Sequence, residues 1–100
     1  MVKHVILWTL SDKLSKEEKE LVKKGIKEGL EGLCGKIDGL EYIKVITEPL
    51  ASSSCDVMLD SGFVSEAALK GYAVHPLHVE VANTRVRPYT ASRVCMDFEA

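Results

Sequence analysis

Several features that mark common protein classes are missing from this sequence. No apolar run approaches the ~20 residues that a membrane-spanning helix needs, so we expect no membrane span. The first residues, Met1 to Trp8, lack both the long apolar stretch and the cleavage site of a signal peptide. A formal net charge of -2 also gives no reason to expect nucleic acid or an anionic membrane as a partner.

Cysteine is scarce, and its placement bears on the cellular compartment. Cys34, Cys55 and Cys95 are odd in number and share no short spacing, so they do not predict a disulfide framework. We expect reduced, buried thiols in a cytoplasmic protein. A reactive thiol is the alternative interpretation.

Motifs for metals, nucleotides and an activated serine are also absent. The sequence has no HExxH, GxGxxG, P-loop or GxSxG pattern. His75 and His78 could both reach a metal ion on a regular helix, but Pro76 lies between them. We therefore predict no metal and no cofactor. Three arginines near the C-terminus could bind an anion, although such residues are mostly solvated or paired: Arg85, Arg87 and Arg93.

What is present is the pattern of a small globular domain. The 100 residues predict one domain, over residues 1–100. Apolar residues make up 46% of the chain and charged residues 28%, which is ordinary for a globular protein. Apolar side chains with a period of two predict four strands. These are Lys3–Leu10, Leu40–Thr47, Asp56–Phe63 and Ala91–Phe98.

Apolar residues at helical spacing predict a helix between the first and second strands and another between the third and fourth. Ser15 opens a capping box that begins the first helix, and Gly35 is its expected end. Ser65 begins the second helix, which stops before Pro76 because the residue before proline disfavours helical backbone. A short helical turn follows from Pro76 to Asn83, and then a loop through Pro88. The order β-α-β-β-α-β predicts an α+β, two-layer, ferredoxin-like fold.

The first and fourth predicted strands are apolar on both faces. Val5 and Leu7 alternate with Ile6 and Trp8, so neither side of the first strand is polar. Two helices can cover only one face of a four-stranded sheet, which leaves the other apolar face open. An open apolar face of that size predicts a partner, and a second copy packed sheet to sheet with twofold symmetry is the simplest one. We predict a homodimer.

The segment Tyr72–Val79 concentrates groups that can transfer protons. It contains two of the three histidines and a tyrosine, around a proline. His78 would lie in the first turn after Pro76, where the positive helix end favours a neutral imidazole that can accept a proton. Tyr72 could then orient a substrate oxygen or donate to it. The structural alternative is that His75 caps a helix and Tyr72 is a core aromatic.

His4 lies on the face of the first strand that also carries Trp8. A single histidine on an apolar face is more often a hydrogen-bonded core residue than a ligand. If this face meets the helices, His4 could approach Tyr72 and His78 and complete a pocket. We therefore take Tyr72 and His78 as the candidate catalytic residues. His4, Trp8 and His75 are the candidate binding residues.

Two segments together resemble the stress-responsive A/B-barrel (Dabb) family. They are the opening strand, Val2–Trp8, and the His-Pro-x-His-Val core of residues 75–79. The resemblance extends over nearly the whole chain, from Lys3 to about Phe98. It implies a ferredoxin-like monomer that dimerises through its sheets into a dimeric α+β barrel, with a role in the stress response.

The chain is also similar to one enzyme of that family, the plant olivetolic acid cyclase. This similarity implies an intramolecular aldol condensation, in which His78 acts as the base on an acidic carbon and Tyr72 holds the carbonyl oxygen. His4 and His75 match further pocket histidines. The sequence departs from the cyclase at Ser54–Val57, around which the cyclase has another pocket histidine.

Two functional hypotheses follow. In the first, the protein is a cofactor-free cyclase or lyase that acts on a small hydrophobic molecule carrying a carbonyl group. In the second, it is a non-catalytic, stress-related dimeric module that binds a small hydrophobic ligand or a protein. A cofactor-free monooxygenase of the similar barrel type is a third option, for which the sequence has no specific motif. Whether the chain is an enzyme stays open at this point.

Overall fold

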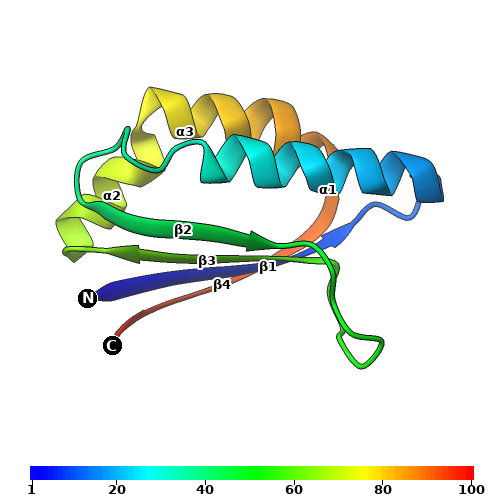
Figure 1. Ribbon diagram of the computed structural model, residues 1–100, viewed down its shortest axis with the longest axis horizontal. Helices are drawn as coiled ribbons and strands as arrows, with labels where there is room; N and C mark the ends of the chain where they lie inside the picture. Colours follow the sequence, from blue (N-terminus) through cyan, green and yellow to red (C-terminus); the bar gives the residue numbers. More distant parts are fainter.

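The computed structural model describes residues 1–100 and has the predicted order of elements (Figure 1). Its helices and strands are β1 (Val2–Leu10), α1 (Lys16–Glu31), β2 (Leu40–Ile46), β3 (Val57–Phe63), α2 (Glu66–Val74), α3 (Pro76–Val81), η1 (Ala82–Val86), η2 (Arg87–Tyr89) and β4 (Thr90–Glu99). All strand boundaries agree with the predicted ones to within one residue, which is the usual variation of such assignments.

The four strands form one antiparallel sheet in the order β2-β3-β1-β4. The helices lie on one face of this sheet, with α1 and α3 next to each other over it (Figure 1). The two chain termini are close together because β1 and β4 are neighbours, and the backbone N–H of Ala100 donates to the carbonyl oxygen of Met1. The predicted two-layer ferredoxin-like α+β fold is confirmed.

The first helix begins as predicted but ends early. The Ser15 hydroxyl accepts a hydrogen bond from the Glu18 backbone N–H, and the Glu18 carboxylate accepts one from the Ser15 N–H. The expected end at Gly35 is wrong, because α1 stops at Glu31 and Gly32 is its C-cap. Tighter turns follow the helix, and Gly35 takes its positive φ of 80° within them rather than at the helix end.

The second helical region is divided at Pro76 as predicted. α2 ends at Val74, His75 is extended, and α3 begins at Pro76. The stretch up to Pro88 was expected to be a loop, and this is wrong. Helical backbone continues from α3 through η1, where the N–H of Arg87 donates to the carbonyl of Ala82 in a wider turn. No proline interrupts the backbone before Pro88, so the helical path persists that far.

The core lies between the sheet and the helices. One cluster of 16 buried apolar residues connects β1, β2 and β3 with α1 and α2. His4, Ile6 and Trp8 of β1 face this cluster, whereas Leu7 is exposed, which confirms the predicted alternation. Ser61 is also buried on β3, and its hydroxyl donates to the backbone carbonyl of His4 at 2.7 Å.

The cysteines differ from the prediction in their burial. All three are free thiols, but Cys34 and Cys95 are exposed and Cys55 is half-buried. Cys34 lies in the turns after α1, outside the core. Cys95 lies on β4, an edge strand over which no helix packs closely, so its side chain keeps contact with solvent. The prediction of buried thiols is therefore wrong, and the cytoplasmic location inferred from them stays a prediction.

The face of the sheet opposite the helices is apolar along β1 and β4. The register places Leu7 beside Val94 and Val5 beside Met96. Val94 is 62% exposed and Met96 66% exposed, although both are large apolar side chains. The open apolar face predicted from the sequence is therefore present. None of the helices has the length and hydrophobicity required to span a membrane.

Candidate functional site

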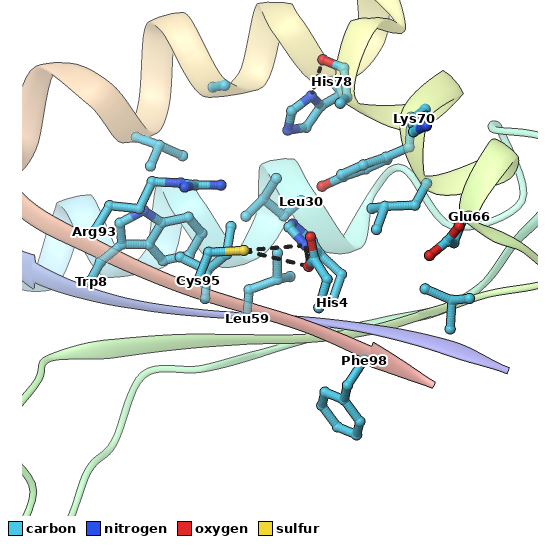
Figure 2. A pocket seen from close by; sticks show the side chains of 18 of the residues that line it. His4, Trp8, Leu30, Leu59, Glu66, Lys70, His78, Arg93, Cys95 and Phe98 are labelled. Atoms are coloured by element: carbon cyan, nitrogen blue, oxygen red, sulfur yellow. Dashed lines mark hydrogen bonds and ion pairs between the residues drawn. The ribbon is translucent and has the colours of Figure 1, made fainter. Parts of the chain in front are cut away.

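A cavity of about 1000 Å³ lies between the helices and the β1–β4 side of the sheet (Figure 2). Four of the five predicted site residues line it, and they come from β1, α2 and α3. These are His4, Trp8, Tyr72 and His78. The fifth, His75, does not line it.

Tyr72 occupies the last turn of α2, where its side chain packs into the core. The residue is 1% exposed, and its ring centroid lies 5.0 Å from that of Phe63. Its hydroxyl has no hydrogen-bond partner within the chain. Burial raises the pKa of the phenol, so the group keeps its proton. A buried hydroxyl without a partner is unfavourable, and a ligand oxygen in the cavity would satisfy it.

His78 is the third residue of α3 and lies beside Tyr72. The two ring centroids are 4.1 Å apart. The His78 Nδ1 is 3.2 Å from the carbonyl oxygen of Ala73, and because a carbonyl only accepts, Nδ1 carries the proton. The Nε2 lone pair is then free to accept a proton.

Burial is the main reason that the pKa of His78 is lowered from its ordinary value of 6.5. The Ala73 carbonyl acts in the opposite direction, and the nearby charges of Arg87, His4 and Arg93 lower the pKa further. A lowered pKa favours the neutral imidazole, in agreement with the prediction. Its dominant cause is loss of solvent, whereas the sequence pointed to the helix end.

His4 lies on the sheet side of the same cavity and is 7% exposed. Its ring centroid is 6.1 Å from that of Tyr72, so the predicted convergence of β1 with the Tyr72–His78 segment occurs. The His4 Nδ1 donates to the Asp97 carboxylate at 2.5 Å. Burial is the largest single influence on the pKa of Asp97 and raises it, but the bond and charge of His4, the bond to Cys95 and the charge of Arg93 together lower that pKa. His4 is thus both a hydrogen-bonded core residue and a cavity residue.

His75 has a structural position. Its Nδ1 accepts a hydrogen bond from the backbone N–H of Leu77 at 3.1 Å, and it is the N-cap of α3. Pro76 occupies the first turn of that helix, as proline often does. The structural alternative therefore describes His75, and its predicted role as a binding residue has no geometric support.

Two arginines predicted as possible anion ligands also line the cavity. Arg93 of β4 pairs with Trp8 in the sheet register, and both side chains are on the cavity side (Figure 2). Arg93 forms no salt bridge within the chain, whereas Arg87 donates to the Asn83 side chain. Arg85 is outside the cavity and donates to the carbonyl of Gly25.

Asp97 and Cys95 complete the β4 side of the cavity. Asp97 was not predicted as a site residue, and Cys95 was considered only as a buried or reactive thiol. Their ligand atoms and the imidazole of His4 lie within 4.8 Å of one another, so this group could hold a metal ion. Asp97 and Cys95 are two positions apart, which places both on one face of a strand. That spacing could have indicated that the two side chains share a face of the strand. It does not show that His4 lies beside them on the neighbouring strand.

Solved structures with the same fold include both uncharacterised and enzymatic proteins. A dimeric protein of unknown function with a ferredoxin-like fold from Bacteroides fragilis is 33% identical, with a TM-score of 0.92 over 99% of this chain and 95% of that one. A Dabb family protein from Mesorhizobium loti is 18% identical, with a TM-score of 0.75 over 99% and 95%. A hydroxynitrile lyase from Passiflora edulis is 16% identical, with a TM-score of 0.71 over 97% and 90%. The last two show a shared fold alone.

The sequence itself gives the family. No curated protein matches it significantly. The stress-responsive A/B barrel domain (Dabb) matches residues 2–100, which is nearly the whole chain. Together with the relative from Bacteroides fragilis, this match establishes the relationship. The chain belongs to the stress-responsive A/B barrel (Dabb) domain family.

Proposed function

We propose that this protein is a cofactor-free enzyme that binds a small hydrophobic molecule carrying a carbonyl group and converts it by acid-base chemistry at Tyr72 and His78. One observation carries the proposal. The Tyr72 hydroxyl is buried, lines the cavity and has no partner, while the neighbouring His78 has a lowered pKa. A proton donor and a proton acceptor thus lie side by side at the wall of a mostly apolar cavity.

The two groups suit removal of a proton from a carbon next to a carbonyl. The Tyr72 hydroxyl donates a hydrogen bond to the carbonyl oxygen, and the Nε2 of His78 takes the proton from the adjacent carbon. Negative charge then develops on the oxygen, where the bond from Tyr72 strengthens. Because its pKa is raised, Tyr72 donates this bond without losing its proton. The protonated His78 returns its proton to the product, so no cofactor is consumed.

Dimerisation is the second part of the proposal. The exposed side chains of Val94 and Met96 lie on the open face of the sheet, and a second copy would cover them. The relative from Bacteroides fragilis is dimeric. The cavity lies on the opposite, helix-facing side, so sheet-to-sheet packing leaves it accessible.

A thermal-shift screen of small aromatic and β-keto compounds tests ligand binding, and turnover assays follow on the hits. A ligand at ten times its dissociation constant stabilises by about 1.4 kcal/mol. This raises the melting midpoint of a domain of this size by roughly 5 °C. We expect Tyr72→Phe and His78→Gln each to abolish turnover of a hit compound. Full activity in both variants would overturn the catalytic assignment.

Matched controls separate the chemistry from general damage. Tyr89→Phe removes a phenolic hydroxyl outside the cavity, and His75→Ala removes a histidine that does not line it. Both are expected to keep turnover of the same compound. If Tyr89→Phe loses activity as completely as Tyr72→Phe, the effect of Tyr72→Phe cannot be assigned to its hydroxyl in the cavity.

A non-catalytic module is the second candidate function, and one observation favours it. Two residues of the His-Pro-x-His segment serve the fold, since His75 caps α3 and Pro76 begins it. In this case ligands stabilise the wild type, no compound is turned over, and His78→Gln binds as well as the wild type. A role in the stress response is compatible with either candidate.

A further inference from the structure

The β4 side of the cavity contains three donor side chains that the acid-base proposal does not use. They are the imidazole of His4, the thiol of Cys95 and the carboxylate of Asp97. We propose that His4 Nδ1, Cys95 Sγ and Asp97 Oδ1 form a binding site for a divalent transition-metal ion, for which zinc is the reference. This inference is independent of the proposed function.

The register of the sheet brings the three residues together. His4 pairs with Asp97 across β1 and β4, and Ile6 pairs with Cys95 two positions along. All three side chains point to the helix-facing side, where they line the cavity. Figure 2 shows dashed lines from the sulfur of Cys95 toward His4, and both residues also contact Asp97 Oδ1. The site is therefore built on two adjacent strands rather than on a loop.

The distances are close to those of a tetrahedral zinc site. With Zn–S near 2.3 Å and Zn–N and Zn–O near 2.0–2.1 Å, the sulfur lies about 3.6 Å from each lighter ligand and the N–O separation is about 3.3 Å. The sulfur of Cys95 is 3.4 Å from Asp97 Oδ1 and 3.8 Å from His4 Nδ1. Only the His4–Asp97 separation, 2.5 Å, is too short. It would lengthen once a metal ion replaces the shared proton.

Charge also favours a divalent cation over an empty cluster. A thiolate and a carboxylate together balance the two positive charges of the ion, so Arg93 nearby then faces a neutral group. Metal binding displaces the thiol proton of Cys95, and His4 keeps its proton on Nε2 when Nδ1 binds the ion. One proton is released to solvent for each ion bound.

The donor set indicates the class of metal. A thiolate and an imidazole prefer zinc and similar transition metals, whereas magnesium and calcium prefer oxygen ligands. Three protein ligands leave the fourth tetrahedral position open, and here it is open to the cavity. A molecule bound in the cavity could therefore occupy that position.

Equilibrium dialysis and calorimetry with zinc test the site on the intact protein. We expect one zinc ion per chain and a loss of affinity of at least about tenfold in Cys95→Ser and in Asp97→Asn. Cys34→Ser is the matched control, because Cys34 is an exposed cysteine outside the cavity, and it should bind zinc like the wild type. Cobalt gives a second readout, since a thiolate–cobalt charge-transfer band should be present in the wild type and absent in Cys95→Ser.

The outcomes are distinct. Absence of stoichiometric zinc binding in the wild type overturns the proposal, as does unchanged affinity in both Cys95→Ser and Asp97→Asn. Loss of the cobalt band in Cys34→Ser would place the metal elsewhere and overturn it too. Circular dichroism and the melting midpoint show whether each variant is folded, and Cys95→Ser changes an exposed, nearly isosteric side chain. Tyr72→Phe should leave zinc affinity unchanged, so this result does not depend on the acid-base proposal.

Discussion

Tyr72 and His78 face each other across the junction of α2 and α3, with their ring centroids 4.1 Å apart. The phenol is buried and has no hydrogen-bond partner, whereas the imidazole is half-buried and is held at Nδ1 by the Ala73 carbonyl. Pro76 creates this relationship, because it ends one helix and starts the next and so turns His78 back toward Tyr72.

Removing the Tyr72 hydroxyl should help stability while it harms function. In Tyr72→Phe the ring remains packed against Phe63, and a buried polar atom without a partner disappears. We expect the free energy of unfolding to stay equal or to rise by up to about 1 kcal/mol. Urea unfolding followed by circular dichroism measures it. A loss of more than about 1 kcal/mol would mean that the hydroxyl has a partner in the folded protein.

The lowered pKa of His78 predicts a pH dependence of stability. The native state disfavours the charged imidazole, so the unfolded chain binds more protons near the ordinary value of 6.5. The contribution of His78 is therefore complete above pH 6.5 and is lost progressively as the pH falls toward the folded-state pKa. Unfolding free energies of the wild type and His78→Gln, measured from pH 8 to pH 5, should show a steeper acid decline in the wild type. Parallel curves would contradict the assignment.

The lowered pKa of His78 also predicts how the activity depends on pH at acid pH. His78 must be neutral to accept a proton, so kcat/KM should fall on the acid side with an apparent pKa below 6.5. Initial rates over this pH range with a turned-over compound measure it. An apparent pKa above 6.5 would point to another base.

His75 should matter for stability more than for chemistry. His75→Ala removes the side chain that accepts from the Leu77 N–H at the start of α3. Loss of such a cap costs about 1 kcal/mol, which thermal or urea unfolding detects. Asparagine is a good cap, so His75→Asn should recover most of the loss. Equal destabilisation in both variants would show that capping is not what His75 contributes.

The open face of the sheet should control dimerisation. Val94→Glu combined with Met96→Glu places like charges opposite one another across a twofold interface, at a cost of about 3 kcal/mol or more. The dissociation constant should rise by about a hundredfold, as sedimentation measures. Leu21→Glu is the matched control, since Leu21 is an exposed apolar residue on α1, away from that face. An unchanged association state in the double variant would contradict the sheet-to-sheet dimer.

The sequence by itself determined the features that depend on neighbouring residues. The capping box at Ser15, the break at Pro76 and the alternation along β1 are all set by local backbone geometry and by side-chain period. The same local information placed Tyr72 and His78 on adjoining turns. The family resemblance then led to the ferredoxin-like fold, which the order of strands and helices predicted independently.

Only the tertiary structure decided which distant groups meet. Asp97 and Cys95 reach His4 through the register of β1 with β4, and more than ninety positions separate them from it along the chain. Sequence periodicity gives the face of a strand but not its pairing register with a distant strand. Burial of the Tyr72 hydroxyl and the lowered pKa of His78 likewise depend on everything packed around them. Desolvation is a property of the assembled core, so residues that are local in sequence acquire their chemistry from residues that are not.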